Sequence, residues 1–371
     1  MNTLQRAEYL AAAAAAFPIL GPISAEDLMD VVRRELGHAE VLDGFARYGS
    51  HHTRAIAPES IVHIVSGNTP HAALQSVIRG LLLGSKNRVK IPSSGLPELS
   101  RFVEQLPLEL RQRVEISPTV GDRWYAEAGA AIAYGSDETI ARIRSRVPAN
   151  TPFQAHPHRL SFGVVFDDPA GESATACARD AALYDQMGCL SLRCVYVREV
   201  ERGFARHYAK ILAAAMETVC AAEKAPVRTL EEAAAILHLR SGYRFRAASD
   251  RSVALWESAG SDAWTVIYED DPWFPSSAAN RVVFVKPLPG DLALAVRPVI
   301  SWIAAIGIFP ATLENAETLT AIGPSRVCPL GSMQFPPWTW HQEGLQTLAG
   351  LVRWVDFEAP QAANSPEFKR P

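Results

Sequence analysis

The feature that most constrains the fold of this chain is a strand-helix-strand pattern that begins at residue 60. The run SIVHIVSG (60–67) is short, apolar and β-branched, which predicts a buried strand. A helical segment follows, with Pro70 in its first turn and Gly84 at its end. The run NRVKIPSS (87–94) predicts the next strand. Units of this kind build parallel sheets, so the pattern predicts an α/β fold.

The alternation of strands and helices continues through most of the chain. Further strands are predicted at 159–167 and in the segments RCVYVRE, WTVIYED and RVVFVKPL, and helices at 97–112, 173–187 and 203–223. A length of 371 residues, 48% of them hydrophobic, provides enough apolar surface for two domains.

Composition excludes several classes of protein. The net charge is -4 and aromatic residues are not interleaved with basic runs, so we expect no nucleic-acid partner. The five cysteines are irregularly spaced without a CxxC pair, which favours reduced thiols and a cytoplasmic location over a disulfide scaffold. No convergent third ligand accompanies the histidine pairs, so no metal site is predicted. The alanine-rich start reads as a short helix rather than a signal peptide, and no membrane span is expected.

The phosphate-binding fingerprints of nucleotide sites are missing from the sequence. No G-x-G-x-x-G and no GK[ST] motif occurs, which disfavours a conventional dinucleotide fold and a P-loop ATPase. SGNTP instead follows the first predicted strand, at the end where α/β sheets bind ligands. Asn68 is either a helix N-cap or an amide donor to a developing oxyanion. Lys90 is either a solvated charge or a partner for a phosphate or ribose.

One cysteine stands at a turn instead of inside an element. In YDQMGCLSLRCVYV, Gly188-Cys189 separates a helical pattern from a strand pattern. Glycine lets the backbone turn and expose the sulfur, and a thiolate can both accept an acyl group and later leave. Position alone also allows an inert, buried thiol at Cys189. Cys194 lies within the predicted strand and is expected in the core.

These segments together resemble a known family. HIVSGNTPHAALQSVIRGLLLGSKNRVKIPSS resembles the strand-helix-strand of the aldehyde dehydrogenase superfamily, and its SGNTP is similar to that of the LuxC-type acyl-CoA reductases. AIAYGSDETI, AHPHRLSFGVVF, YDQMGCLSLRCVYV and GPSRVCPLGSMQFPPWTWHQEG resemble later blocks of the same family, in the same order. The likeness spans roughly residues 58 to 358.

The resemblance implies a set of roles for individual residues. Cys189 would be the nucleophile, and Asn68 with the Cys189 backbone N–H would form the oxyanion hole. The family's cofactor is usually NADPH, with NADH left open, bound on an atypical Rossmann domain without the glycine fingerprint. The residues expected along that cofactor are Ser66, Gly67, Lys90, Gly135 and Ser136.

One departure from the superfamily bears on the reaction. Aldehyde oxidisers carry a glutamate about thirty residues before the cysteine, where it activates water. This chain has no glutamate from Thr139 to Gly171, and His156-Pro157-His158-Arg159 occupies the matching place. Loss of that base favours an acyl reducer, which must avoid hydrolysis. His156 and His158 are candidates for proton transfer by position, with a loop or supporting role as the alternative.

We therefore expect an aldehyde dehydrogenase-like α/β fold and NAD(P)H-dependent reduction of an acyl thioester to an aldehyde. The cofactor domain is expected over 1–170 and the catalytic domain over 171–330, with 331–371 returning to the first domain and ending in a disordered tail. The substrate is an acyl-CoA or an acyl-carrier thioester, and acyl-transfer partners and a homo-oligomer are left open. The rivals are a cysteine acyltransferase or thioesterase without nicotinamide chemistry, and a non-catalytic acyl-CoA or partner-binding subunit.

Overall fold

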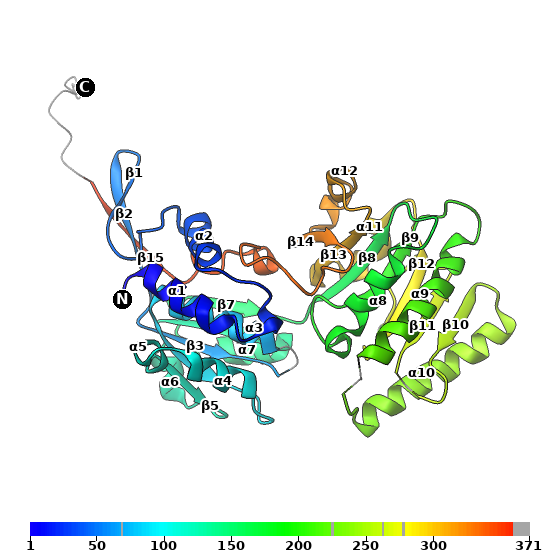
Figure 1. Cartoon of the computed structure of the whole chain (residues 1–371), viewed down its shortest axis with the longest axis horizontal. Coiled ribbons are helices and arrows are strands. Elements are labelled where there is room, and N and C mark those ends of the chain that lie inside the picture. Colours follow the sequence, from blue (N-terminus) through cyan, green and yellow to red (C-terminus); the bar gives the residue numbers. More distant parts are fainter. Residues whose placement is uncertain (68–69, 224–225, 262, 277–278, 359–371) are drawn as a thin grey trace, which may run out of the picture. The chain divides into compact units, whose positions relative to one another are not determined.

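The computed structural model describes residues 1–67, 70–223, 226–261, 263–276 and 279–358 (Figure 1). The chain forms two compact units. Unit 1 comprises Met1–His156 and Gln346–Pro371, and unit 2 comprises Pro157–Leu345. The domain limits expected from the sequence, at 170 and 330, stay a prediction.

Unit 1 is built on a parallel five-stranded sheet in the order β5-β4-β3-β6-β7. The chain enters at the central strand β3, runs outward through β4 and β5, and then returns to the other side of β3 as β6 and β7. This reversal of direction is a topological switch point between β3 and β6. The strands are β3 (Ser60–Ile64), β4 (Lys86–Lys90), β5 (Val114–Ser117), β6 (Ala130–Tyr134) and β7 (Phe153–His156).

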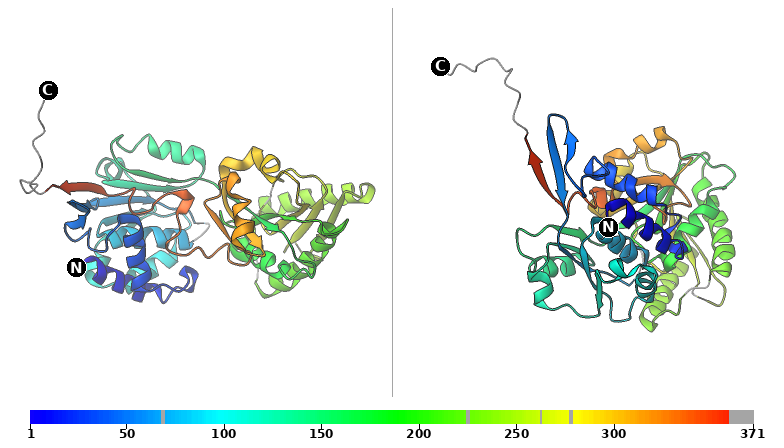
Figure 2. Two further views of the ribbon diagram at one scale, coloured as in Figure 1. Left: turned by 90° about the horizontal axis from the view of Figure 1, so that it is seen from above. Right: turned by 60° about the vertical axis from the view of Figure 1, so that its left-hand side comes forward.

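Helices cover this sheet and a small second sheet adjoins it. The helix α3 (Pro70–Leu83) is buried along nearly its whole length, and Leu74, Ile78 and Leu81 are fully enclosed. The sheet β1-β2-β15 is antiparallel, and Figure 2 shows β15, in red, beside the blue hairpin. The remaining elements are α1 (Thr3–Ala14), η1 (Pro18–Leu20), α2 (Ala25–Leu36), β1 (Ala46–Tyr48), β2 (His51–Ile56), α4 (Pro97–Gln105), α5 (Leu108–Arg111), α6 (Asp122–Ala126), α7 (Asp137–Arg144) and β15 (Arg353–Phe357).

Unit 2 contains a seven-stranded sheet in the order β10-β11-β12-β9-β8-β13-β14. Only the edge strand β10 runs antiparallel to its neighbour. Its strands are β8 (Leu160–Val165), β9 (Leu192–Val197), β10 (Val253–Glu257), β11 (Thr265–Glu269), β12 (Val282–Pro287), β13 (Ile303–Phe309) and β14 (Arg326–Pro329).

Both faces of the unit 2 sheet are covered. Side chains of β9 alternate, so that Val195 and Val197 pack under α8 and α9, whereas Cys194 and Tyr196 belong to the core on the opposite face. Its helices are α8 (Ala174–Ala182), η2 (Leu183–Gln186), α9 (Phe204–Ala222), α10 (Leu230–Ser249), α11 (Leu292–Val296), η3 (Arg297–Trp302), α12 (Leu313–Glu317), η4 (Thr320–Ile322) and η5 (Gln342–Gly344).

The structure confirms the α/β class and corrects two helix predictions. The helix expected at 97–112 is divided into α4 and α5, and Pro107 stands between them. The helix expected at 173–187 ends as α8 at Ala182, because Tyr184, Asp185 and Gln186 adopt left-handed backbone angles.

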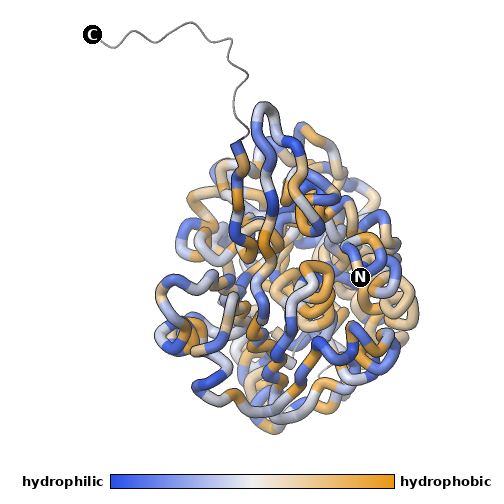
Figure 3. Tube along the Cα trace, turned by 90° about the vertical axis from the view of Figure 1, so that its left-hand side faces the viewer, coloured by the Kyte–Doolittle hydropathy of each residue, from blue (hydrophilic) through white to orange (hydrophobic). Residues whose placement is uncertain are grey.

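Short hydrophobic stretches broken by hydrophilic residues follow one another along the described trace (Figure 3). Within the described part of the chain, no single helix combines the length and apolar character needed to cross a membrane. The segments Thr3–Ala14 and Pro18–Leu36 meet that test only together, as a pair bent by 119°.

Candidate active site

Cys189 lies in unit 2 on a tight turn between η2 and β9. The Ser191 N–H donates to the Gly188 carbonyl over 3.1 Å, which closes the turn with Cys189 at its second position. Leu190 points into the core, whereas Cys189 is exposed. The other four cysteines, Cys177, Cys194, Cys220 and Cys328, are all buried. Of the five thiols, Cys189 is therefore the one that a reagent can reach in the folded protein.

Hydrogen bonds fix this turn from two sides. The Ser161 hydroxyl at the start of β8 donates to the Cys189 carbonyl at 2.8 Å and accepts from the Ala305 N–H at 3.1 Å. On the other side, the Gln334 amide donates to the Ser191 hydroxyl at 2.7 Å. Ser161 and Ser191 are completely buried, so these bonds hold the turn without competition from water.

The segment before the turn is held in a conformation that non-glycine residues seldom adopt. Tyr184, Asp185 and Gln186 have φ angles of 56°, 51° and 63°. Each such residue costs on the order of 1–3 kcal/mol and persists only where its surroundings hold it. The Gln186 side chain provides one restraint, because it donates to the carbonyls of Leu192 and Val282 and accepts from the Val282 N–H.

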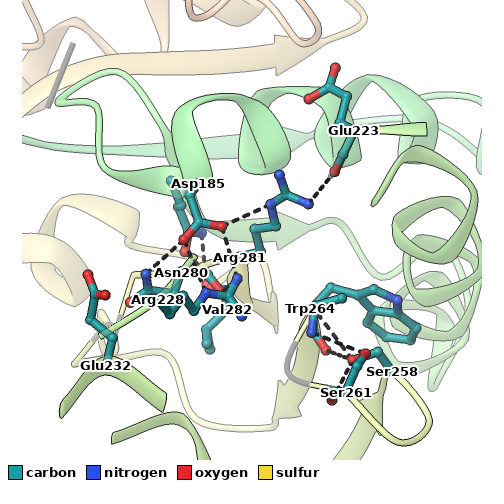
Figure 4. Close-up of polar contacts among 12 residues, drawn as sticks. Asp185, Glu223, Arg228, Glu232, Ser258, Ser261, Trp264, Asn280, Arg281 and Val282 are labelled. Atoms are coloured by element: carbon teal, nitrogen blue, oxygen red, sulfur yellow. Dashed lines mark hydrogen bonds and ion pairs between the residues drawn. The ribbon is translucent and has the colours of Figure 1, made fainter. Parts of the chain in front are cut away.

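A buried charge cluster provides the second restraint (Figure 4). The Asp185 carboxylate pairs with Arg228 at 2.9 Å and with Arg281 at 3.0 Å, and accepts from the Asn280 amide at 2.8 Å. The three ionic side chains are only 3–4% exposed. Asn280 and Arg281 have positive φ angles as well. The cluster thus joins two strained segments, and one of them leads directly into the cysteine turn.

Three charged residues of unit 2, Arg159, Arg193 and Glu343, influence the pKa of the thiol. Arg159 and Glu343 form an ion pair, and the Glu343 side chain is only 5% exposed. Limited solvation and the Glu343 carboxylate raise the pKa of the Cys189 thiol, and Arg159 and Arg193 act in the opposite sense. A thiolate at this exposed position keeps water on its open side, which moderates the rise. Burial also raises the pKa of Glu343, while Arg159 lowers it.

The predicted cofactor residues of unit 1 gather at the carboxyl edge of its sheet. Ile64 pairs in register with Lys90 on one side and with Ala133 on the other. Ser66 and Gly67 follow β3, Lys90 ends β4, and Gly135 and Ser136 follow β6. The switch point between β3 and β6 therefore lies among these five residues. Asn68 lies outside the described residues.

Two glycines at this edge are closely packed. A Cβ at Gly135 would lie 3.1 Å from the Thr139 side chain, and one at Gly67 would lie 3.1 Å from Pro92. Ser136 caps α7, because its hydroxyl accepts from the Thr139 N–H. The Pro92 and Thr139 side chains therefore pack directly against the backbone at these two glycines.

The two histidines proposed for proton transfer occupy different surroundings. His156 ends β7 in unit 1, is buried, and stacks on Tyr134 with ring centroids 4.4 Å apart. His158 belongs to unit 2 and is exposed. Their part in proton transfer stays a prediction.

Sequence reasoning missed the residues that contact the turn or its charges, namely Ser161, Arg159 and Glu343. Arg159 is the first residue of the strand predicted at 159–167, and Glu343 lies inside a block quoted for its resemblance. Neither segment alone indicates that its side chain lies near Cys189. Glu269, within the predicted strand segment WTVIYED, is held by Lys286, Arg246 and Tyr243 within the core.

Solved structures similar to this chain show its fold. Succinic semialdehyde dehydrogenase from Streptococcus pyogenes aligns with a TM-score of 0.64 at 13% identity, covering 96% of this chain and 90% of that one. Gamma-glutamyl-gamma-aminobutyraldehyde dehydrogenase from Burkholderia cenocepacia aligns with a TM-score of 0.67 at 14% identity, covering 96% and 85%. The fold is therefore that of the aldehyde dehydrogenases.

Sequence comparison narrows the class to one family. The family model for acyl-CoA reductase (LuxC) matches residues 2–354, and the chain belongs to that family. The long-chain acyl-protein thioester reductase of Aliivibrio fischeri is 24% identical over 363 residues, covering 90% of this chain and 71% of the relative. The protein of the same name from Vibrio harveyi is 24% identical over 184 residues, covering 46% and 38%.

Proposed function

We propose that this protein reduces an acyl thioester to an aldehyde with NADPH or NADH, through an acyl group held on Cys189. The observation that carries the proposal is the single exposed thiol on a turn fixed by Ser161 and Gln334. Family membership supplies the reaction class. The relative from A. fischeri is named for acyl-protein thioesters, so both acyl-CoA and a carrier-bound acyl group are proposed donors.

The proposed reaction has two stages, both at the Cys189 sulfur. The Cys189 sulfur attacks the acyl carbon, and the donor thiolate leaves and takes up a proton. The acyl-cysteine then accepts hydride at its carbonyl carbon, and the resulting thiohemiacetal releases aldehyde and the Cys189 thiolate. The Cys189 N–H and Asn68 are proposed to stabilise the oxyanion, and one such donor is worth about 3–4 kcal/mol in related acyl transfers.

The carboxyl edge of the unit 1 sheet fits a nicotinamide dinucleotide. Gly67 and Gly135 lie beside the switch point, and their close packing against Pro92 and Thr139 leaves no space for a side chain at either position. Lys90 and Ser136 are proposed to hold its phosphates or ribose. When bound, the cofactor supplies the hydride. The S. pyogenes enzyme, which shares the fold, was solved with NADP+.

The rivals are a cysteine acyltransferase or thioesterase and a non-catalytic binding subunit. His156 and His158 remain proposed proton carriers. The proposal also includes acyl-transfer partner proteins, a homo-oligomer and a cytoplasmic location.

The first experiment incubates the purified protein with NADPH and a panel of acyl-CoAs and acyl-carrier thioesters. Aldehyde is trapped, and the NADPH absorbance is followed.

We expect aldehyde to appear in step with NADPH loss, and Cys189→Ala to lower the rate by on the order of 10³ or more. Cys220→Ala, which removes a buried thiol of the same unit, is the matched control and should retain activity. Cleavage of thioester without NADPH loss would replace the proposal by a transferase or thioesterase. Complete inactivity on every donor would favour the binding subunit.

A further inference from the structure

A cavity of about 410 Å³ lies in unit 1 at the beginning of β4. It is bordered by α1, by the turn between α3 and β4, and by the segment around α5. Lys86 begins β4 and Lys90 ends it, so at about 3.3 Å per residue the two positions are about 13 Å apart. The cavity is therefore separate from the proposed cofactor edge of the same sheet. Its lining includes Arg6, Gly84, Lys86, Glu109, Leu110 and Arg113.

Gly84 brings two guanidinium groups to this cavity. Its φ is 86°, and a Cβ at this position would lie 3.3 Å from Cζ of Arg6, so Arg6 packs directly on the turn. Arg113 donates from Nη1 to the Gly84 carbonyl over 2.7 Å. Hydrogen bonds to two backbone carbonyls and to the Thr3 hydroxyl fix the direction of Arg6. Both guanidinium groups therefore contact one glycine.

The charges that line the cavity do not balance. Arg6, Lys86 and Arg113 supply three positive charges and Glu109 supplies one negative charge, which leaves an excess of two. Burial lowers the pKa of Arg6, Asp43 acts in the opposite sense, and Arg113 lowers it further. Like charges held in this way repel each other, and an anion between them removes the repulsion.

The carboxylates nearest to these cations lie outside the cavity. Asp43 is 3.8 Å from Arg6, but it already accepts from the Thr3 N–H and hydroxyl at 2.9–3.1 Å. Glu59 pairs with Lys86 over 3.2 Å where both side chains are well exposed, and such a pair is weak in water. Neither carboxylate is among the described residues that line the cavity.

We propose that this cavity binds an organic phosphate, whose phosphate oxygens accept hydrogen bonds from Arg6, Lys86 and Arg113. Guanidinium groups form paired hydrogen bonds with phosphate, and lysine adds a compact positive charge. Among the described residues Arg113 makes one hydrogen bond, which leaves four of its five N–H donors for a ligand.

The size of the cavity indicates a ligand larger than a free phosphate ion. Its volume lies within the range of about 300–1,000 Å³ that is usual for small-molecule sites, and Leu110 supplies an apolar part of the wall. Two sources carry this chemistry, namely the nucleotide end of a coenzyme A thioester and a separate nucleotide. Only the first source rests on the proposed function, and the site itself does not.

The test measures binding of inorganic pyrophosphate to the full-length protein by isothermal titration calorimetry at low ionic strength. The variants are Arg113→Gln, which removes a cation from the lining, and Glu109→Gln, which removes its carboxylate. Arg101→Gln and Glu104→Gln make the same charge changes at exposed positions of unit 1 outside the described lining, and they are the matched controls.

The two lining variants are expected to act in opposite directions. Arg113→Gln should weaken pyrophosphate binding about tenfold or more, with Arg113→Lys between it and the wild type. Glu109→Gln should tighten binding several-fold, because a like charge leaves the site. Both controls should stay near the wild type. A titration with the adenosine bisphosphate of coenzyme A and one with ADP then separate the two sources, since the true source should bind more tightly.

Other results would overturn the assignment. Absence of pyrophosphate binding would reject the site, and equal weakening in Arg113→Gln and Arg101→Gln would reduce it to general ionic attraction. Weakening in Lys90→Gln but not in Arg113→Gln would place the anion at the cofactor edge instead. A gain of affinity in Glu109→Gln cannot come from misfolding, so this variant decides the question if Arg113→Gln fails to fold. The aldehyde assay is separate, so failure of the reductase proposal and failure of this site are distinguishable.

Discussion

The interiors of the two units treat polar groups differently. In unit 1, the completely buried His63 lies between the Ser76 hydroxyl and the Asn87 side-chain oxygen, each at 2.8 Å, and burial lowers its pKa to about 4. In unit 2, several buried side chains are charged and paired, as in the Asp185 cluster, Arg159–Glu343 and Lys286–Glu269. Unit 1 also buries charged groups, such as Arg6 and Glu35, so the contrast lies between its neutral, hydrogen-bonded His63 and the ion pairs of unit 2.

The difference matches the proposed chemistry of each unit. A dinucleotide site at a sheet edge needs a bare backbone and a rigid sheet, which neutral polar groups and apolar packing provide. A nucleophilic cysteine needs a turn held in a strained conformation and a controlled electrostatic field. In unit 2, ion pairs provide both the restraint on the turn and the electrostatic field, because charges fixed at short range hold the chain in one geometry. Four substitutions test this contrast.

The largest effect is expected from Asp185→Asn. Loss of this carboxylate removes the buried negative charge that Arg228 and Arg281 share, and breaking a buried ion pair in this way costs about 3–5 kcal/mol. Urea unfolding at pH 7 measures the loss. The exposed Asp270→Asn in the same unit is the control and should change stability little. A loss below about 1 kcal/mol at Asp185 would show that the charges of unit 2 are dispensable.

The second effect concerns Asp180, which accepts from the backbone N–H groups of Gly331 and Met333. Burial raises its pKa to about 7, above an ordinary value of 3.8. A raised pKa means that the folded state holds the proton, so this contribution is present below about pH 4 and is lost as pH rises toward 7. Between pH 4 and pH 7, this contribution to the free energy of unfolding should fall by up to about 1.4 kcal/mol per pH unit.

Asp180→Asn should remove that slope, as measured by denaturant unfolding at intervals from pH 4 to 7. The comparison is the difference between variant and wild type, so other titrating groups cancel. A difference that does not change with pH would mean that Asp180 is ionised across this range in the folded protein.

The opposite pH dependence is expected in unit 1. The pKa of His63 is lowered from 6.5 to about 4, so its contribution is present above pH 6.5 and is lost as pH falls toward 4. His63→Gln keeps a donor and an acceptor but does not titrate. The free energy of unfolding of this variant should therefore depend less on pH between 6.5 and 4. Hydrogen exchange of peptides from β3 and β4 measures this dependence. Equal slopes for His63→Gln and Asp180→Asn would abolish the contrast between the units.

The smallest effect is expected at the proposed cofactor edge. Gly135→Ala places a methyl group 3.1 Å from the Thr139 side chain, and overpacking of this kind costs on the order of 1 kcal/mol or more. We expect NADPH binding, measured by fluorescence, to weaken several-fold. The exposed Gly121→Ala has nothing within 4 Å of the added methyl and serves as the control. Unchanged NADPH binding in Gly135→Ala would contradict the placement of the cofactor at this edge of the sheet.

Much of the fold could be predicted because it depends on local patterns. The runs at 60–67 and 159–167 are apolar because strands in a covered parallel sheet are buried on both faces, and the structure places β3 and β8 there. Cys189 could be singled out because glycine beside it marked a turn. The left-handed run Tyr184–Gln186 could not be predicted, since no glycine or asparagine indicates it and distant Asn280 and Val282 hold it.

The sequence by itself determined the α/β class, the carboxyl edge of the first sheet and the cysteine at a turn, because periodicity and turn residues act over a few positions. Only the tertiary structure decided which charges influence the pKa of that cysteine. Arg159 and Glu343 are 184 residues apart in the chain, and Asp185 and Asn280 are 95 apart. Pairings of this kind leave no periodic signal, since each side chain is specified by the geometry of the other segment.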